Sequence, residues 1–508
     1  MSAPSWSPSI PILLLVSVLL PPLGFVLLWT RSGTRLRRKL LGTVPIAALA
    51  VTHLVLFFGL RMEMDGSGMF PIFSFHKPQS HFAALEASRG QPSQPGPAAP
   101  VEVERNTPAL QLRPPQESLT PPAAYWTGFR GPRRDGHYEE MEILTAWPPG
   151  GLPLLWRQPI GGGYASFAVA AGKAFTIEQR RQQEVVAAYA IDTGRELWTH
   201  SWDGKFTESM GGEGPRATPT WDDGRLYALG ARGQFRCLQA NTGNLIWRRD
   251  ILSDNQASNL TWGMAASPLI IDEKVIVLPG GPSGKSVVAY HKLTGEPLWK
   301  SLDDKQAYTS PIVATFAGRR QILVVSAQRA LGLTVEDGSL LWDYPWTTQF
   351  DINSAQPILL SDNRFFISAA YDHGAAVVEI TKASAGFQAR TVWQNNRMKN
   401  KFTSSVLHQG HIYGLDESML ACVNAQTGEL KWKGGRYGYG QLLLASGHLI
   451  VLTESGDLVL VKAFPERHQE LARFSAIAGK TWNHPSLAGG LLLVRNTTEM
   501  ACFRIAPR

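Results

Sequence analysis

Short apolar runs alternate with turn sequences from about residue 150 to the end of the chain. One such run, VVAAY at 185–189, precedes a Thr193-Gly194 turn and a short segment that ends at Trp198. Glycine supplies the positive φ of a tight hairpin turn, and a neighbouring Thr, Asn or Asp hydrogen-bonds the local backbone. The pattern therefore predicts short antiparallel strands joined by tight turns.

The run, the turn and the terminal tryptophan recur at intervals of roughly 40 to 50 residues, a period typical of a stacked supersecondary unit. The tryptophans that end these units are Trp156, Trp198, Trp247, Trp299, Trp342, Trp393 and Trp432. Two more apolar runs lie upstream in each unit, so each unit is predicted to hold about four strands. One such sheet cannot bury both of its faces alone, and a large ring on its outer strand fills the gap to the next sheet. We therefore predict an all-β propeller in which these tryptophans dock neighbouring blades.

Counting the first strand of each unit predicts an eight-bladed propeller. These strands are ASFAVA, ATPTW, ASPLII, TSPIVA, SAQPILL, TSSVL, QLLLAS and HPSLAG. Seven blades is the alternative, if the weak unit that ends at Trp393 is not a blade. The seventh unit lacks its tryptophan, and Phe474 is predicted to replace it. A lone strand ends at Trp156, and three strands follow Trp482, so the N-terminal strand is predicted to complete the last blade and remove an exposed sheet edge.

The N-terminal region predicts a membrane anchor. The uncharged runs Ile10–Trp29 and Leu41–Leu60 are each long enough to cross a bilayer, and Pro21-Pro22 is expected to kink the first. The basic residues lie between the two runs, in 31–39, and such residues stay in the cytoplasm. Residues 1–60 are therefore predicted to form a transmembrane helical hairpin in the bacterial inner membrane, with the rest of the chain in the periplasm. A cleaved signal peptide is the alternative, but its basic residues would precede the apolar run.

Composition divides the remaining chain. Residues 61–122 are rich in Pro, Gln, Ser, Ala and Gly, which predicts a disordered linker, and residues 123–508 form the predicted propeller.

The three cysteines, Cys237, Cys422 and Cys502, occupy equivalent third strands of separate units, which predicts small buried apolar residues rather than disulfides. The net charge is +8. Nucleic-acid binding would need a basic aromatic patch, and an outward-facing domain has little access to nucleic acid, so none is expected as a partner.

The segments AYAIDTGRELW and CVNAQTGELKW resemble the tryptophan-docking repeat of the quinoprotein (pyrroloquinoline quinone, PQQ) propeller superfamily. The segment WTGFRGPRRDG at 126–136 also resembles the start of quinone-repeat proteins. The superfamily includes quinone-dependent alcohol dehydrogenases and cofactor-free binding propellers, such as the lipoprotein of the outer-membrane barrel-assembly machine. In the dehydrogenases the resemblance implies PQQ between a Trp and a ring of two adjacent bonded cysteines, with a Ca²⁺ and an Asp base. This chain has no adjacent cysteines and no C-x-x-C-H haem motif, so PQQ and Ca²⁺ belong only to the alternative, and no catalytic or metal-binding residue is predicted.

Ligands of propellers bind where the innermost strands converge on the axis, so the loops that enter the first strand of each blade are the candidate site. Cationic and aromatic side chains in these loops suit an anionic or aromatic ligand, or a peptide. The candidates are Arg216, Trp262, Tyr308, Asp351, Asn353, Lys399, Lys401, Tyr437, Tyr439, Trp482 and Asn483. The alternative for each is that it caps a strand or bonds a neighbouring loop, and His484 is expected to be structural.

These features predict a membrane-anchored, periplasm-facing module that binds or scaffolds other proteins at the cell envelope. The expected partners are envelope proteins or peptide segments. The alternative is an oxidoreductase of the PQQ-dependent alcohol dehydrogenase type. A stacked quinone with Ca²⁺ would distinguish the second function from the first.

Overall fold

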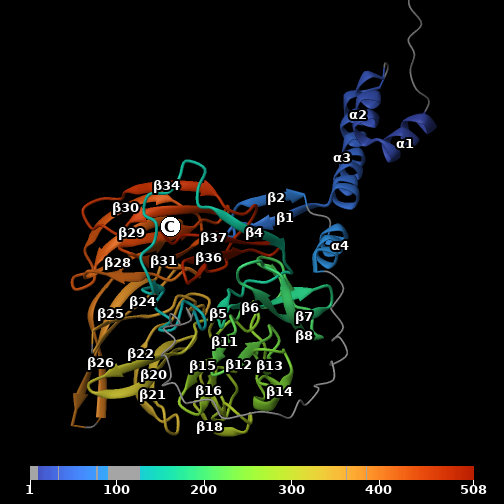
Figure 1. Cartoon of the computed structure of the whole chain (residues 1–508). Coiled ribbons are helices and arrows are strands. Elements are labelled where there is room, and N and C mark those ends of the chain that lie inside the picture. The colour runs from blue at the N-terminus through green and yellow to red at the C-terminus, as the bar shows by residue number, and fades with distance from the viewer. Residues whose placement is uncertain are drawn as a thin grey trace, which may run out of the picture. The chain divides into compact units, whose positions relative to one another are not determined.

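A computed structural model describes residues 10–31, 34–75, 78–89, 126–361, 363–384 and 386–507. The chain divides into two compact units, Met1–Ala83 and Ala84–Arg508. The larger unit contains eight antiparallel sheets that follow one another along the chain (Figure 1). The prediction of an eight-bladed all-β propeller is confirmed, and the seven-blade alternative is wrong.

Each blade has four antiparallel strands, named here in order from the innermost strand outward. The first blade contains β5 (Ala168–Ala170), β6 (Lys173–Arg180), β7 (Gln183–Ala190) and β8 (Glu196–Asp203), and the second contains β11 (Thr220–Asp222), β12 (Arg225–Leu229), β13 (Gln234–Gln239) and β14 (Leu245–Asp250). The third contains β15 (Leu269–Ile271), β16 (Lys274–Val277), β17 (Val287–His291) and β18 (Pro297–Ser301). The fourth contains β19 (Ile312–Phe316), β20 (Arg319–Val325), β21 (Arg329–Thr334) and β22 (Leu340–Pro345). A short hairpin, β9 (Thr207–Glu208) and β10 (Gly212–Glu213), lies between the first two blades, and the 3-10 helix η1 (Ser253–Asn255) follows β14.

The last four blades complete the ring. The fifth blade contains β23 (Ile358–Ser361), β24 (Arg364–Ala369), β25 (Gly374–Ala383) and β26 (Gly386–Asn395), and the sixth contains β27 (Val406–His408), β28 (His411–Asp416), β29 (Met419–Asn424) and β30 (Leu430–Arg436). The seventh contains β31 (Gln441–Ala445), β32 (His448–Leu452), β33 (Asp457–Lys462) and β34 (Glu470–Ser475). The eighth contains β35 (Ser486–Ala488), β36 (Leu491–Arg495), β37 (Glu499–Arg504) and β4 (Leu154–Pro159). Strand β4 pairs with β37, with Trp156 opposite Cys502, so the predicted closure by the N-terminal strand is confirmed.

The tryptophan at the end of a blade docks on the turn of the next blade. The indole Nε1 of Trp198 donates a hydrogen bond to the Ala240 carbonyl oxygen at 3.0 Å. Its ring covers Gly243, where φ is +75° and an added Cβ would lie 2.4 Å from the ring. The same contact joins Trp156 to Gly194, Trp247 to Gly295, Trp299 to Gly338 and Trp393 to Gly428. In these five blades the tryptophan therefore docks on the glycine of the turn in the next blade.

Three blades vary this contact. Trp432 donates to the Phe464 carbonyl oxygen at 2.8 Å. Trp342 donates to Gln321 Oε1 of its own blade, because the fifth blade has the long β25–β26 hairpin instead of a Thr-Gly turn. Phe474 covers Gly151, so it takes the place of the seventh tryptophan as the sequence predicts.

Apolar side chains of adjacent blades form the core. One cluster, which includes Trp247 and Tyr290, joins the second and third blades. The three cysteines are free and buried in β13, β29 and β37, each opposite a docking tryptophan. Burial raises the pKa of each thiol to about 12, so their prediction as small apolar residues is confirmed.

The smaller unit contains α1 (Ile10–Leu19), α2 (Pro21–Thr30), α3 (Leu36–Phe58), β1 (Leu60–Met64) and β2 (Pro71–Phe75). Among the described residues one helix, over Leu36–Leu56, is long and apolar enough to cross a membrane. The first apolar run is not one continuous helix, because Pro21-Pro22 begins a new helix of ten residues. The described part of this unit therefore has one helix of spanning length and two short helices, and the break between the short helices lies at Pro21-Pro22, where a kink is predicted.

Residues 60–89 differ from the predicted linker. Strands β1 and β2 form an antiparallel hairpin, and α4 follows over Pro78–Arg89. Asp65 Oδ1 accepts the backbone N–H groups of Gly68, Met69 and Phe70, which fixes the hairpin turn. The remainder of the predicted linker, up to residue 122, lies outside the described residues.

Candidate functional site

One segment, Trp126–Tyr138, lies along the axis of the propeller, and we name it the axial segment. Its first residue pairs with Val169 of β5, and the Trp221 amide of β11 donates to the Thr127 carbonyl oxygen. At its other end, strand β3 (His137–Tyr138) pairs in parallel with the innermost strand β31. The axial segment thus contacts the inner edges of the first, second and seventh blades, so it lies inside the ring formed by the innermost strands. The axial segment therefore fills the position at which a propeller channel would run.

The buried guanidinium of Arg134, in the axial segment, is hydrogen-bonded to oxygen atoms of several blades. Its Nη1 donates to the carbonyl oxygens of Ser267 and Pro311, each at 3.1 Å, and its Nη2 donates to Thr220 Oγ1 at 3.3 Å. The Nη2 also donates to the Pro268 carbonyl oxygen. Among the described residues no carboxylate forms an ion pair with it. Burial lowers the pKa of Arg134 to about 9, so the guanidinium stays charged at neutral pH and depends on these carbonyl oxygens.

Arg130 makes similar contacts on the other side of the axis. Its guanidinium donates to the carbonyl oxygens of Ser404 at 3.2 Å and Ser405 at 2.6 Å. Its Nη1 lies 3.5 Å from His484 Nε2. Burial and the Arg130 charge lower the pKa of His484 to about 3, so this imidazole is neutral. His484 also contacts Phe129, which agrees with the structural role expected for it.

A ring of hydroxyl groups surrounds the axial segment at the start of the innermost strands. The backbone N–H of a residue in one blade donates to the hydroxyl of the equivalent residue in the next blade. The donor and acceptor pairs are Ser166 to Thr218, Thr218 to Ser267, Ser267 to Ser310 and Gln356 to Ser404. The sequence analysis did not identify this ring, although the Ser or Thr repeated before Pro in ATP, ASP and TSP is a signal of it.

The mouth is the face formed by the loops that lead from the outer strand of one blade to the innermost strand of the next. Aromatic rings from four of these loops meet there. The Trp482 ring lies 4.8 Å from Phe402 and 5.3 Å from Tyr164, and Phe402 lies 5.8 Å from Tyr439. The Trp482 indole donates to Glu454 Oε1 at 2.8 Å, so the polar edge of this ring is satisfied while the ring faces remain in the cluster.

Cations cover the faces of these rings. Lys401 Nζ lies 5.2 Å from the Tyr439 ring centre and 5.4 Å from that of Tyr371, and Lys480 Nζ lies 4.4 Å from Trp482. Cation–π contacts of this kind hold both partners in place. We name the four rings with Tyr371, Arg216, Lys401 and Lys480 the mouth cluster.

Arg216 links the cluster to a second aromatic pair. Its guanidinium lies 5.6 Å from the Tyr164 ring and pairs with Glu208 at 2.8 Å. Trp262 and Tyr308 meet edge to face with ring centres 5.6 Å apart. Burial raises the pKa of Tyr308 to about 12, so its phenol is neutral at physiological pH.

The structure brings together some of the predicted site residues and separates others. Those at the mouth are Arg216, Trp262, Tyr308, Lys401, Tyr439 and Trp482. Tyr164, Phe402, Lys480 and Tyr371 also belong there and were not predicted, although Phe402 and Lys480 lie within two residues of a predicted member.

The other five predicted residues lie outside the mouth cluster and contact neighbouring loops or charged side chains. Asn353 and Asn483 are buried and donate to carbonyl oxygens of adjacent loops. The Tyr437 hydroxyl lies between blades, where it donates to Glu470. Asp351 pairs with Lys305 at 3.0 Å, and Lys399 Nζ lies 3.8 Å from Asp372.

A PQQ site of the dehydrogenase kind does not fit these residues. The axial segment occupies the channel, and the cysteines lie in three separate blades. Within the described ranges no group of three His, Cys, Asp or Glu side chains could hold a metal ion. At the mouth, Glu208 pairs with Arg216, and Glu417 accepts the Tyr439 hydroxyl at 3.0 Å. The oxygen ligands that Ca²⁺ requires are therefore not gathered at one point.

The chain was compared with known proteins. A protein from Yersinia pestis, "Outer membrane protein assembly factor BamB", is 21% identical over 288 residues, which cover 52% of this chain and 68% of that protein. The crystal structure of BamB from Moraxella catarrhalis matches with a TM-score of 0.51 at 15% identity, covering 70% of this chain and 100% of that one. Quinohemoprotein alcohol dehydrogenase ADHIIG from Pseudomonas putida HK5 matches with a TM-score of 0.53 at 11% identity, covering 76% and 82%. At these identities the two structures show the fold alone.

The family model described as "Outer membrane protein assembly factor BamB" matches residues 181–434, which is half of the chain. These residues span the first six blades, from the β6–β7 turn of the first to the outer strand of the sixth. The chain therefore belongs to the PQQ-like propeller-repeat family described as outer membrane protein assembly factor BamB.

Proposed function

We propose that this protein is a binding and scaffolding module of the bacterial cell envelope, without a catalytic role, and that its mouth holds a protein partner. The observation that carries the proposal is the difference between the axis, which is filled, and the mouth, where rings and cations gather. The axis is filled by the chain's own axial segment, whereas the mouth presents aromatic rings and cations from several blades. Because such rings and cations are concentrated at the energetic centres of protein interfaces, the mouth cluster suits a protein or peptide better than a buried cofactor.

The relatives support an envelope partner. Proteins of this family are named outer membrane protein assembly factors, so we propose an envelope protein or a peptide segment in that process as the partner. We also propose that α3 crosses the inner membrane, that the basic residues of 31–39 lie in the cytoplasm and that the propeller lies in the periplasm. The short helices α1 and α2 would then form the other arm of the membrane hairpin.

One labelling experiment tests both the location and the partner surface. The native thiols are buried and protonated, so a cysteine placed at an exposed position is the reactive one. Lys305→Cys lies at the mouth, and its matched control Glu273→Cys lies on the turn at the opposite end of the innermost strand β15. Spheroplasts of the native host are treated with a maleimide that cannot cross the membrane.

We expect Glu273→Cys to be labelled quickly and Lys305→Cys several-fold more slowly, because the partner covers the mouth. Adding Lys401→Glu, which places a carboxylate among the rings of the mouth cluster, is expected to release the partner and to restore labelling at residue 305. Equal labelling of the two cysteines, with or without Lys401→Glu, would reject the mouth as the partner surface. Labelling of neither until the cells are lysed would instead reject the periplasmic location.

A further inference from the structure

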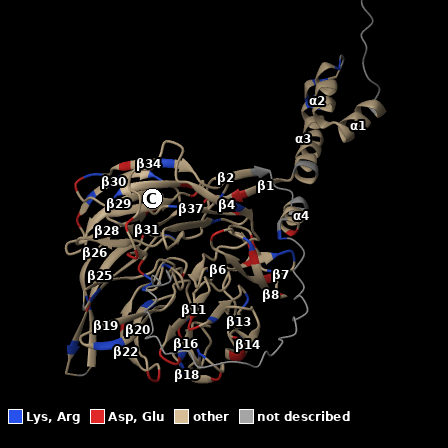
Figure 2. Ribbon diagram, in the orientation of Figure 1, with Lys and Arg blue, Asp and Glu red and all other residues tan. Residues whose placement is uncertain are grey.

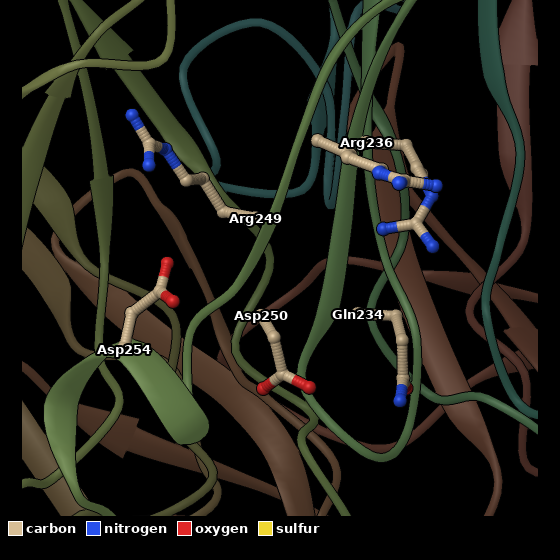
Figure 3. Close-up of a pocket in the computed structure, with 6 residues that line it drawn as sticks. Gln234, Arg236, Arg249, Asp250 and Asp254 are labelled. Carbon is tan, nitrogen blue, oxygen red and sulfur yellow. The ribbon is translucent and has the colours of Figure 1, made fainter.

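A second polar site lies at the outer strands of the second blade, outside the mouth cluster. A cavity of about 280 Å³ opens beside the outer strands β13 and β14 and the 3-10 helix η1. Its lining residues are Gln234, Arg236, Arg248, Arg249, Asp250 and Asp254 (Figure 3). All six side chains are polar or charged. An apolar ligand therefore has no surface to bind here, whereas a charged one does.

Two arginines face each other at the centre of this cavity. Arg236 on β13 is the direct cross-strand partner of Arg248 on β14. In the part of the chain that the structure describes, neither forms an ion pair with a carboxylate. Like charges directly opposite each other on a sheet are destabilising. Elsewhere on the blades that Figure 2 shows, basic and acidic residues are interspersed.

The Arg236 guanidinium is held in place by an aromatic ring and by a backbone carbonyl oxygen. It lies 4.8 Å from the ring centre of Trp202, which belongs to the first blade, and its Nη1 donates to the Phe235 carbonyl oxygen at 3.1 Å. Burial and the charge of Arg248 lower the pKa of Arg236, while the carboxylates of Asp250 and Glu184 act in the opposite direction. An added negative charge beside Arg248 would relieve the repulsion between the two guanidinium groups.

The two acidic residues of the cavity lie differently with respect to the arginine pair. Asp250 Oδ1 accepts the backbone N–H groups of Leu252 and Ser253, which begins η1. Asp254 lies with Arg249 on the side of the cavity opposite Arg236 and Gln234 (Figure 3). Arg249 itself donates to the Gly295 carbonyl oxygen at 2.7 Å and pairs with Glu296 at 2.9 Å. Among the described residues, Arg236 and Arg248 are therefore the two cavity arginines without a carboxylate within ion-pair distance.

We propose that Arg236 and Arg248 form a binding site for a phosphate group. Two adjacent guanidinium groups present planar pairs of N–H donors that match the oxygen atoms of phosphate. A bound phosphate would neutralise both charges and remove the repulsion across the strand pair. The phosphate can belong to free inorganic phosphate or to a lipid headgroup, and both present the same oxygen atoms. The site is independent of the proposed mouth interface.

Equilibrium dialysis of the full-length protein in detergent against radiolabelled inorganic phosphate, at constant ionic strength, tests the proposal. We expect saturable binding of one phosphate per chain and a loss of affinity of about tenfold or more in Arg248→Gln, since a charge-assisted hydrogen bond is lost. Arg248 is exposed, so this variant is expected to fold normally. Arg236→Gln is the second variant, and Arg467→Gln, an exposed arginine on the seventh blade, is the matched control.

A second arm uses glycerophosphoglycerol, a soluble phosphodiester, to distinguish the sources of the phosphate. Displacement of labelled phosphate by the diester, lost in Arg248→Gln, indicates a lipid headgroup, and displacement by inorganic phosphate alone indicates the free ion. The proposal is overturned if millimolar phosphate does not bind the native protein, or if Arg248→Gln and Arg467→Gln bind it equally.

Discussion

Replacing Arg134 with methionine is expected to lower the free energy of unfolding of the propeller by at least about 3 kcal/mol. The native guanidinium donates to carbonyl oxygens of Ser267 in the third blade and Pro311 in the fourth. Methionine fills much of the same volume but leaves these buried acceptors without a donor, at a cost of about 1–3 kcal/mol each. Urea denaturation followed by tryptophan fluorescence measures the change.

The neighbouring Arg133 provides the matched control. Its side chain is 55% exposed and pairs with Asp135 and Glu139, so Arg133→Met is expected to change stability by less than about 1 kcal/mol. Arg134→Lys keeps the charge but cannot reach acceptors in both blades, so it should fall between the native protein and Arg134→Met. Equal effects of Arg133→Met and Arg134→Met would show that the axial segment does not hold the blades together.

Replacing Gly243 with alanine is expected to cost about 2–4 kcal/mol, because the new methyl group meets the docking tryptophan of the preceding blade. An added Cβ would lie 2.4 Å from the Trp198 ring, and the backbone φ is +75°. The tryptophan must therefore move away from the turn and give up its hydrogen bond to the Ala240 carbonyl oxygen. Thermal unfolding followed by circular dichroism measures the loss.

Gly224 of the same blade separates the two contributions. Its φ is +74°, nearly that of Gly243, but nothing lies within 4 Å of an added Cβ. Gly224→Ala is therefore expected to cost only the backbone strain, about 1–2 kcal/mol. If the two variants unfold at the same temperature, the contact between tryptophan and glycine does not contribute to blade docking.

The repeat predicts the blades because the elements that define a blade are local in the chain. A strand, a Thr-Gly turn and a tryptophan lie within about a dozen residues, so their order specifies their pairing. The two departures from the repeat also follow from the contact between a docking ring and a glycine of the next blade. Trp342 bonds within its own blade because the next blade has no Thr-Gly turn, and Phe474 replaces a tryptophan because it still covers a glycine, Gly151.

The axial segment could not be predicted in this way. Its arginines suggest an exposed turn, because an isolated charge is costly to bury. Arg134 is tolerated at the axis only because carbonyl oxygens from separate blades point at it. These carbonyl oxygens lie 133 to 177 residues away along the chain, and they meet only when the ring closes.

The position of the mouth could be predicted from the sequence, but the direction of each side chain in it could not. The topology alone brings the loops before the innermost strands to one face, so Lys401 and Trp482 were identified correctly as mouth residues. Whether a side chain points into the mouth or back into the loop depends on the loop conformation. Asn353 and Asn483 turn inward because their amides satisfy carbonyl oxygens that would otherwise be buried without a donor.

The most direct test of the filled axis is a titration of the purified full-length protein with PQQ in the presence of Ca²⁺. Tryptophan fluorescence reports binding, and reduction of a dye with a primary alcohol reports turnover. With Trp126–Tyr138 along the axis, we expect no saturable quenching at micromolar PQQ and no dye reduction. Saturable quenching at one PQQ per chain, together with alcohol-dependent dye reduction, would contradict the account and identify the protein as a quinone-dependent dehydrogenase.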